Sequence, residues 1–184
     1  MKLQLFLILL CLLFVISCQK SPTGPSFNAN LLVNPTFQQN GKASLDGWMV
    51  VDSAGVQLSS DVPSSGSGHS VVVSPSWLPT WPIGIIYQAI PASAGTHLYH
   101  LSVFGKKTGV SGGVAVRLNR PDSNPAQGWF PGITVIDTVW TSYSQVDTIT
   151  AAAGDTLFFA VRTGACELCT GSTYLSFCSF EKLD

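Results

Sequence analysis

Three tryptophans in proline-containing loops are the side chains best suited to binding. Trp77 and Trp81 lie in Ser74-Pro75-Ser76-Trp77-Leu78-Pro79-Thr80-Trp81-Pro82, and Trp129 lies in Gln127-Gly128-Trp129-Phe130-Pro131-Gly132. Proline restricts the backbone, so rings on such loops lose little entropy when they bind a ligand. We predict that these three rings stack on a ligand. The alternative is that they plug the ends of a hydrophobic core, as loop aromatics often do.

Strand alternation defines a second set of candidate residues. Successive residues of a strand face opposite sides, so each apolar run should bury one side and expose the other. If the strands concerned share a sheet, their outer side forms a shallow platform that carries hydrogen-bond donors and stacking rings. The alternative is an ordinary solvated sheet surface. The candidates for this platform are His100, Phe104, Arg117, Asn119 and Arg162.

Short strands are the elements that must position these side chains. From Trp48 onward, apolar β-branched runs alternate with turn residues, and no segment keeps a 3.6-residue period for three turns. An all-β fold with almost no helix is therefore predicted. The expected strands are Leu31–Val33, Gly47–Asp52, His69–Val73, Ile83–Ile90, His97–Lys106, Val114–Arg120, Ile133–Ile136, Thr141–Thr150, Thr156–Thr163 and Thr173–Leu183.

The N-terminal region has the pattern of a secreted, lipid-anchored protein. Met1-Lys2 precedes an apolar run, 3–16, that is too short for a comfortable transmembrane helix. The run ends in Val15-Ile16-Ser17-Cys18, which resembles a bacterial lipobox and implies lipidation of Cys18. The alternative is an ordinary signal peptide. We therefore expect a signal at 1–17, a flexible tether at 18–29, one domain at 30–184, and a location in the bacterial cell envelope, at the outer membrane.

Composition narrows the functional classes. The chain contains nine Lys and Arg residues and ten Asp and Glu residues, so that only 10% of its residues are charged. Without a charge block, nucleic-acid binding is not predicted. Abundant hydroxyls, amides and rings suit neutral hydrogen-bonding ligands better than ionic ones. No carboxylate pair and no Gly-x-Ser-x-Gly motif points to hydrolytic chemistry, so we do not predict an enzyme.

Cysteines and histidines offer structural roles. Cys166 and Cys169 flank Glu167-Leu168 in a loop, and in an oxidising compartment they are predicted to form a small disulfide. Cys178 is predicted to be a free, buried cysteine. A zinc site formed by all three cysteines is the minor alternative. His97 and His100 are three residues apart in a strand and so face opposite sides, which predicts no shared metal site.

The order of several motifs resembles a known family. These motifs are Asn30-Leu31-Leu32-Val33-Asn34-Pro35-Thr36-Phe37, Gly47-Trp48, the Tyr-Gln strand 84–90, Gly95-Thr96-His97-Leu98-Tyr99-His100-Leu101-Ser102, Trp140-Thr141-Ser142-Tyr143, 155–161 and 174–182. Together they resemble jelly-roll carbohydrate-binding modules of the xylan- and glucan-binding type, within the galactose-binding-like group. The resemblance implies a jelly-roll β-sandwich of two antiparallel sheets. It also implies core positions for Trp48 and Trp140.

The same resemblance implies a function. It predicts a non-catalytic, lipid-anchored protein that holds polysaccharide or oligosaccharide at the cell envelope. The alternatives are an envelope structural or adhesion subunit that binds a protein partner and, last, a jelly-roll lyase or hydrolase. These modules often bind a structural calcium through carboxylates, but Gln38 and Ser176-Phe177 occupy those positions here. No cofactor is therefore predicted, and a structural calcium is the alternative.

Overall fold

Strands dominate the part of the chain that the computed structural model describes, residues 29–51, 53–75, 86–120, 130, 132–163 and 170–184. No helix occurs in these ranges. None of the described residues therefore provides a helix long and apolar enough to cross a membrane. The predicted all-β class is confirmed. The strands are β1 (Gln38–Gln39), β2 (Lys42–Ala43), β3 (Met49–Val50), β4 (Val56–Ser59), β5 (Ser70–Val73), β6 (Ile86–Pro91), β7 (Gly95–Lys107), β8 (Gly112–Asn119), β9 (Ile133–Thr134), β10 (Thr141–Ala151), β11 (Thr156–Thr163) and β12 (Thr173–Lys182).

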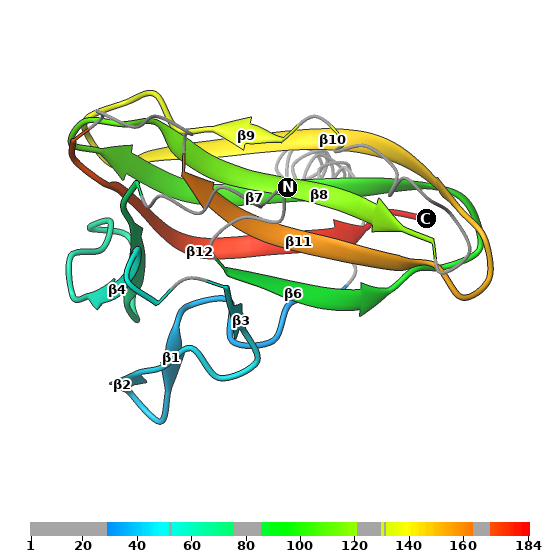
Figure 1. The fold of residues 1–184 in the computed structure, drawn as a ribbon, viewed down its shortest axis with the longest axis horizontal. Coiled ribbons are helices and arrows are strands. Elements are labelled where there is room, and N and C mark those ends of the chain that lie inside the picture. The colour runs from blue at the N-terminus through cyan, green and yellow to red at the C-terminus, as the bar shows by residue number, and fades with distance from the viewer. Residues whose placement is uncertain (1–28, 52, 76–85, 121–129, 131, 164–169) are drawn as a thin grey trace, which may run out of the picture.

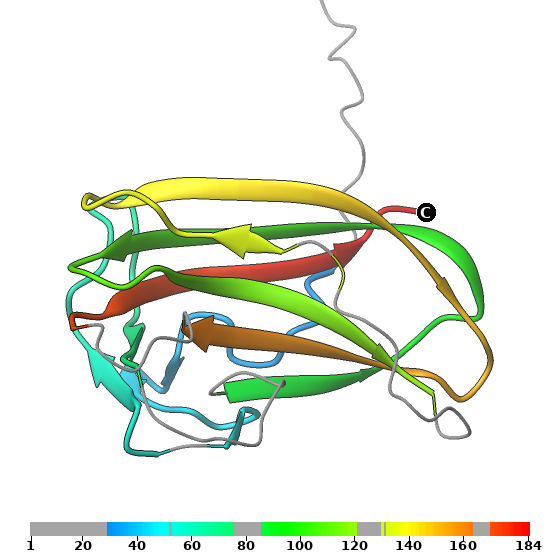
Figure 2. The same cartoon turned by 45° about the horizontal axis from the view of Figure 1, so that its top comes forward.

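Two antiparallel five-stranded sheets form the sandwich. The first sheet has the order β10-β7-β12-β5-β4, and the second has the order β3-β6-β11-β8-β9. Consecutive strands lie in different sheets at β3/β4, β5/β6, β6/β7, β7/β8, β9/β10, β10/β11 and β11/β12. Figures 1 and 2 show the long strands of the two layers running along the same axis. This arrangement confirms the predicted jelly-roll sandwich.

The core follows the predicted alternation. Tyr99, Leu101 and Val103 of β7 are buried, and so are the inward residues Val114, Val116 and Leu118 of β8 and Leu157, Phe159 and Val161 of β11. Ala115 and Ala160, which were predicted to face outward, are buried as well. Phe37 and Trp48 pack against each other with ring centroids 5.1 Å apart, and Trp48 is 6% exposed, which confirms its core position. Cys178 is also buried, and burial raises the pKa of its thiol. It therefore behaves as a small apolar residue, as predicted.

The prediction of a first strand at Leu31–Val33 was wrong. These residues do not form a strand, although Leu31 N donates a hydrogen bond to Phe180 O of β12. Side chains satisfy this backbone instead: Gln88 accepts from Val33 N and donates to Val33 O, and Asn30 Oδ1 accepts from Leu32 N and Phe180 N. Amide side chains thus replace a neighbouring strand, which apolar alternation alone does not reveal. The pattern also missed β1, β2 and β4, which are too short to show a clear period.

Candidate functional site

The candidate platform residues divide between the two sheets. His100 and Phe104 belong to β7 of the first sheet, whereas Arg117 and Asn119 of β8 and Arg162 of β11 belong to the second. The idea of one platform shared by all five was therefore wrong, because the chain crosses between sheets at the β7–β8 turn. Each group alternates with core residues and so faces outward, away from the opposite sheet. We call these surfaces the first-sheet outer face and the second-sheet outer face.

The second-sheet outer face is organised by the register of three strands. Phe158 of β11 lies between Arg117 of β8 and Ala89 of β6. Its ring meets that of Tyr87 in a T-shaped contact with centroids 5.2 Å apart. Such a pair presents apolar surface together with a phenolic hydroxyl, and a guanidinium lies opposite it. Neither Phe158 nor Tyr87 was among the site residues predicted from the sequence, although the alternation of apolar residues in β11 is consistent with an outward Phe158.

Small residues occupy the outward positions beside the aromatic pair, and two of them are covered by other parts of the chain. Ala115 and Ala160 are register partners on β8 and β11, with exposures of 5% and 0%. Gly113 pairs with Arg162 on one side and with Thr134 of β9 on the other. An added Cβ on Gly113 would lie 1.9 Å from Ile133 O, so a larger residue does not fit against β9. The close approach of β8 and β9 therefore depends on glycine.

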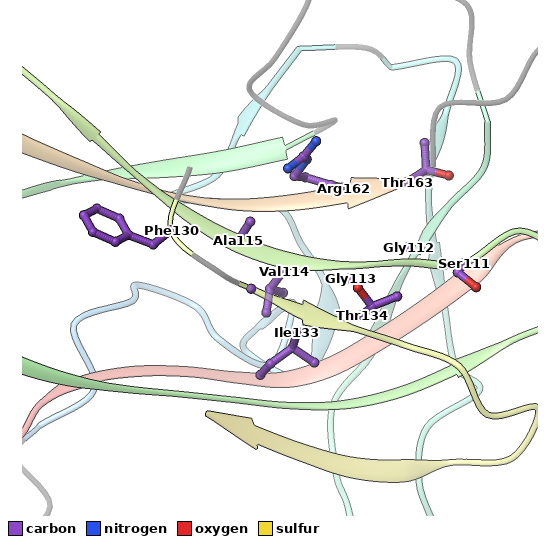
Figure 3. Close-up of a pocket in the computed structure, with 11 residues that line it drawn as sticks. Ser111, Gly112, Gly113, Val114, Ala115, Phe130, Ile133, Thr134, Arg162 and Thr163 are labelled. Carbon is purple, nitrogen blue, oxygen red and sulfur yellow. The ribbon is translucent and has the colours of Figure 1, made fainter. Parts of the chain in front are cut away.

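A pocket of about 290 Å³ forms a hollow between β8, β9 and the C-terminal end of β11. That volume is at the lower end for small-molecule sites, which begin near about 300 Å³. Figure 3 shows Arg162 projecting on the same side as Ala115, with Phe130 at one end of the pocket and Ser111 at the other. The residues that line it are Ser111, Gly112, Gly113, Val114, Ala115, Phe130, Gly132, Ile133, Thr134, Arg162 and Thr163.

Polar groups in the pocket are arranged for a polar ligand. The hydroxyl oxygen of Thr163 is buried and makes no hydrogen bond, although buried hydroxyls nearly always have a partner. Ser111 Oγ accepts a hydrogen bond from Lys107 Nζ at 2.9 Å, which brings an ammonium group to one rim. Burial lowers the pKa of Arg162, because its surroundings are poor in water. The pocket thus combines partial desolvation with hydrogen-bonding capacity.

The first-sheet outer face carries a closed polar cluster. Asp61 accepts hydrogen bonds from Lys106 Nζ and from Trp140 Nε1, the latter at 3.0 Å. The Lys106 ammonium also lies 5.3 Å from the ring centre of Trp140 and 5.0 Å from that of Tyr174. These contacts correct the prediction that Trp140 is a core residue. Its indole lies outside the core cluster because Asp61 and Lys106 provide it with partners at the surface.

His100 and Phe104 lie elsewhere on this same face. Phe104 contacts Phe177 in a T-shaped pair with centroids 6.1 Å apart. Phe177 has a φ of 51°, at the β-bulge of β12, so a strained backbone holds its ring outward. His100 lies opposite Glu181 in the register of β7 and β12. No residue of this face lines the pocket described above.

Several predicted site residues lie outside the described residues. They are Trp77, Trp81 and Trp129, the lipidation candidate Cys18, and the disulfide candidates Cys166 and Cys169. Their roles stay predictions. In the sequence, however, Trp129 directly precedes the pocket residue Phe130, and Trp81 lies five residues before Ile86, the start of β6. Among the described residues, no three His, Cys, Asp or Glu side chains are close enough to hold a metal ion.

Sequence comparisons give no relative. No protein-family model matches the chain, and no curated protein matches it.

Solved structures, by contrast, match over most of the chain. A xylan-binding domain from CBM22 is 18% identical, with a TM-score of 0.55 over 85% of this chain and 97% of that one. TmCBM61, solved in complex with β-1,4-galactotriose, is 16% identical, with a TM-score of 0.53 over 84% of this chain and 99% of that one. The active domain of bacteriophage CBA120 tailspike protein 4 is 19% identical, with a TM-score of 0.54.

The extent of these matches differs. The tailspike match covers 83% of this chain but only 21% of the tailspike chain, whereas the two binding modules are covered almost completely. At these identities the likeness concerns the fold. The fold of this chain is therefore the jelly-roll sandwich found in carbohydrate-binding modules.

Proposed function

We propose that this protein is a non-catalytic glycan-binding module whose ligand lies on the second-sheet outer face. The observation that carries the proposal is the pocket on this face, which is lined by Phe130, the Arg162 guanidinium and the buried Thr163 hydroxyl that lacks a partner. The Tyr87–Phe158 ring pair lies on the same face. A sugar presents both an apolar C–H face and hydroxyl groups. The structural likeness to modules solved with or named for saccharides supports the same ligand class.

The rings beside the pocket have a defined part in this proposal. Phe158 and Tyr87 provide an apolar wall against which a sugar ring can pack, while Arg117 and Asn119 supply donors on the adjacent strand. At the other end, Thr134 and Thr163 line the hollow together with Arg162. We include Trp77, Trp81 and Trp129 as further stacking candidates from the flanking loops.

A matched pair of ring deletions tests the location of the site. Binding of the full chain in detergent to xylan, β-glucan, mannan, β-1,4-galactan and alginate is measured by calorimetry. Phe158→Ala removes a ring from the second-sheet outer face, and Phe104→Ala makes the same change on the first. We expect Phe158→Ala to weaken binding by about fivefold, since a stacked ring contributes on the order of 1 kcal/mol. Phe104→Ala should have little effect.

Two results contradict the proposal. If none of the glycans binds, the proposed glycan-binding function is wrong. A loss with Phe104→Ala and none with Phe158→Ala moves the site to the first-sheet outer face. Thermal unfolding of both variants serves as the control for folding.

The proposal extends to the location of the protein. Lipidation at Cys18 followed by a short tether would hold the sandwich at the surface of a bacterial membrane. Replacing Cys18 by Ser should move the protein from the membrane fraction to the soluble fraction and abolish labelling with radioactive palmitate. Unchanged fractionation and labelling of Cys18→Ser would remove the lipid anchor while leaving glycan binding untouched.

A further inference from the structure

Strand β10 is the longest edge strand of the two sheets that the structure describes. The edge strands are β10 and β4 in the first sheet and β3 and β9 in the second. β4 has four residues, and β3 and β9 have two each, whereas β10 has eleven. A short edge strand offers few backbone groups for pairing, which is one way in which proteins prevent association between sheets. β10 lacks that protection.

The outer side of β10 has no neighbouring strand among the described residues. All eleven of its register pairs join it to β7 without a shift in register. In Figure 2, β10 runs along the upper rim of the sandwich, with no described strand above it. At its C-terminal end, the Thr150 carbonyl oxygen accepts a hydrogen bond from Arg120 Nη2 at 3.5 Å. An antiparallel edge strand directs the N–H and C=O groups of alternate residues away from its neighbour, so backbone donors and acceptors line this side.

The sequence of β10 carries few of the features that block pairing at an edge. Residues 141–151 include no proline and no lysine. Asp147 is their only charged residue, and both of its carboxylate oxygens accept from Gln145 Nε2 at 3.0 Å. Asp147 and Gln145 share the inward parity of the buried Ile149. Because an inward charge protects an edge, a strand that pairs with β10 must place a polar group opposite Asp147.

A second copy of β10 meets this requirement. A two-fold axis between antiparallel strands is perpendicular to the sheet, so residues of the same face lie opposite each other. With the axis at Val146, the middle of the strand, all eleven residues pair, and Asp147 lies opposite Gln145 of the second copy. An axis at Asp147 would place two carboxylates opposite each other, which is unfavourable. The axis at Val146 therefore gives both the longest overlap and a polar partner for the charge.

The outward residues of β10 fit the same register. Val146 is apolar but 52% exposed, and its neighbours on this face are Ser144 and Thr148. With the axis at Val146, the valine packs against its own copy, and both side chains are removed from water. Ser144 then lies opposite Thr148, and hydroxyl side chains in such positions hydrogen bond across strands. This pairing accounts for an exposed valine in the middle of a polar strand face.

We propose that the protein forms a two-fold symmetric dimer through β10, in which the first sheets of both copies join into one antiparallel sheet with Val146 on the axis. The inference goes beyond the proposed glycan-binding function and does not depend on it. Because the axis is perpendicular to the sheet, both second-sheet outer faces point to the same side of the dimer. A polysaccharide can then contact two sites at once, which raises its apparent affinity without any new contact within a site.

Disulfide trapping tests the register directly. Val146→Cys places two thiols opposite each other on the axis, within reach of a disulfide. Ser144→Cys is the matched control on the same face, because the two copies of residue 144 are four residues apart, about 13 Å at the rise of a strand. The full chain in detergent is oxidised with copper phenanthroline and separated on non-reducing gels. We expect a covalent dimer with Val146→Cys and none above the wild-type background with Ser144→Cys, since Cα atoms more than about 7 Å apart cannot be bridged.

A mixture of two variants tests the pairing a second time. Thr148→Cys alone should not cross-link, for the same reason as Ser144→Cys. When the two variants are mixed, a covalent dimer should form between them, because Ser144 lies opposite Thr148 in this register. The wild type gives the background from the native cysteines.

Sedimentation over a range of concentrations measures the dimer without cross-linking. Val146→Lys places two ammonium groups opposite each other and removes the buried valine, so it should raise the dissociation constant of the dimer by about tenfold or more. Gln57→Lys adds the same charge at an exposed position of β4, the opposite edge of the same sheet, and should leave the dissociation constant unchanged. Thermal unfolding shows whether each variant is folded.

Each outcome decides the inference. Cross-linking confined to Val146→Cys and to the mixture of Ser144→Cys with Thr148→Cys supports it. A monomer at every concentration overturns it, and so does cross-linking of Ser144→Cys alone to the same extent as Val146→Cys. A dimer that Val146→Lys does not weaken has its interface elsewhere and also overturns it. Glycan binding by a monomer leaves the proposed function standing, whereas a β10 dimer that binds no glycan contradicts the proposed function alone.

Discussion

The two outer faces of the sandwich use similar residue types in different ways. On the first, Asp61, Lys106, Trp140 and Tyr174 contact one another and leave a closed cluster. On the second, the register places alanine and glycine between aromatic and cationic residues, and a pocket of about 290 Å³ remains. Aromatic rings and charges are therefore not sufficient to indicate a binding site. What distinguishes the second face is that small neighbours leave space there, and that the buried Thr163 hydroxyl lining this space makes no hydrogen bond.

The largest effect is expected from a substitution that places a larger side chain at Gly113 in the pocket. Gly113→Val should destabilise the protein by about 2–3 kcal/mol, the usual effect of forcing extra carbons into a packed site, and should abolish glycan binding. The cause is the contact between a new Cβ and Ile133 O, which lies on backbone and cannot rotate away. Denaturant unfolding measures the first effect, and calorimetry measures the second.

A glycine with open surroundings provides the control. Gly41 has no atom within 4 Å of an added Cβ, but its φ of 76° strains any larger residue. Gly41→Ala should therefore cost about 1 kcal/mol through backbone strain and leave binding intact. Normal stability and binding of Gly113→Val would contradict the close approach of β8 and β9.

Two threonines differ in whether their buried hydroxyl group makes a hydrogen bond. Thr173 is fully buried and donates to Val110 O at 3.0 Å, so Thr173→Val should cost about 1–2 kcal/mol by leaving that carbonyl without its donor. The buried hydroxyl of Thr163 makes no hydrogen bond, so Thr163→Val should leave stability unchanged or raise it by up to about 1 kcal/mol.

The effects of these two substitutions on glycan affinity are expected in the opposite order to their effects on stability. If Thr163 faces the ligand in the pocket, Thr163→Val weakens glycan binding, whereas Thr173→Val does not. Denaturant unfolding with and without glycan measures both quantities in the same variants. Equal destabilisation by the two substitutions would show that the Thr163 hydroxyl already has a partner in the folded protein.

Much of the fold could be predicted from the sequence because burial imposes a strict period on strands. The inward positions of β7, β8 and β11 followed from the alternation of apolar residues, and so did the outward positions of Arg117 and Arg162. Alternation does not say which strands are neighbours, so the grouping of His100 and Phe104 with these arginines was wrong. Pairing between strands distant in the sequence depends on the path of the chain through both sheets.

The pocket could not be predicted for a related reason. It arises where Gly113, Ala115 and Gly132 approach one another across strands, and small residues carry no local signal of a cavity. Trp140 shows the same limit in the other direction. A tryptophan at the start of a strand suggests a core position, but its surface location depends on Asp61, which lies 79 residues earlier in the sequence.

The closed cluster on the first-sheet outer face makes a smaller contribution to stability. Trp140→Phe removes the indole donor to Asp61 and retains most of the ring, so it should destabilise the protein by about 0.5–1 kcal/mol. Asp61→Asn removes the charge that Lys106 faces and should have a similar effect, because Asp61 is well exposed and exposed pairs contribute little. Neither change should alter glycan binding. Reduced affinity in either variant would link the two faces and weaken the assignment of the site to the second sheet.

The pH dependence of that cluster gives the smallest expected effect. The hydrogen bond from Lys106, followed by that from Trp140, lowers the pKa of Asp61 below its ordinary value of 3.8. A carboxylate with a lowered pKa in the folded state stabilises the protein above the ordinary value, and this stabilisation is lost as the pH falls through the folded-state pKa. The stability difference between the wild type and Asp61→Asn should therefore be constant above about pH 5 and should shrink below about pH 4. Denaturant unfolding at both pH values measures this difference.

Because Asp61 is exposed, high salt should reduce the difference at neutral pH as well. A difference that is independent of pH would mean that the amide replaces the carboxylate as an acceptor, and that the cluster is held by hydrogen-bond geometry rather than by charge.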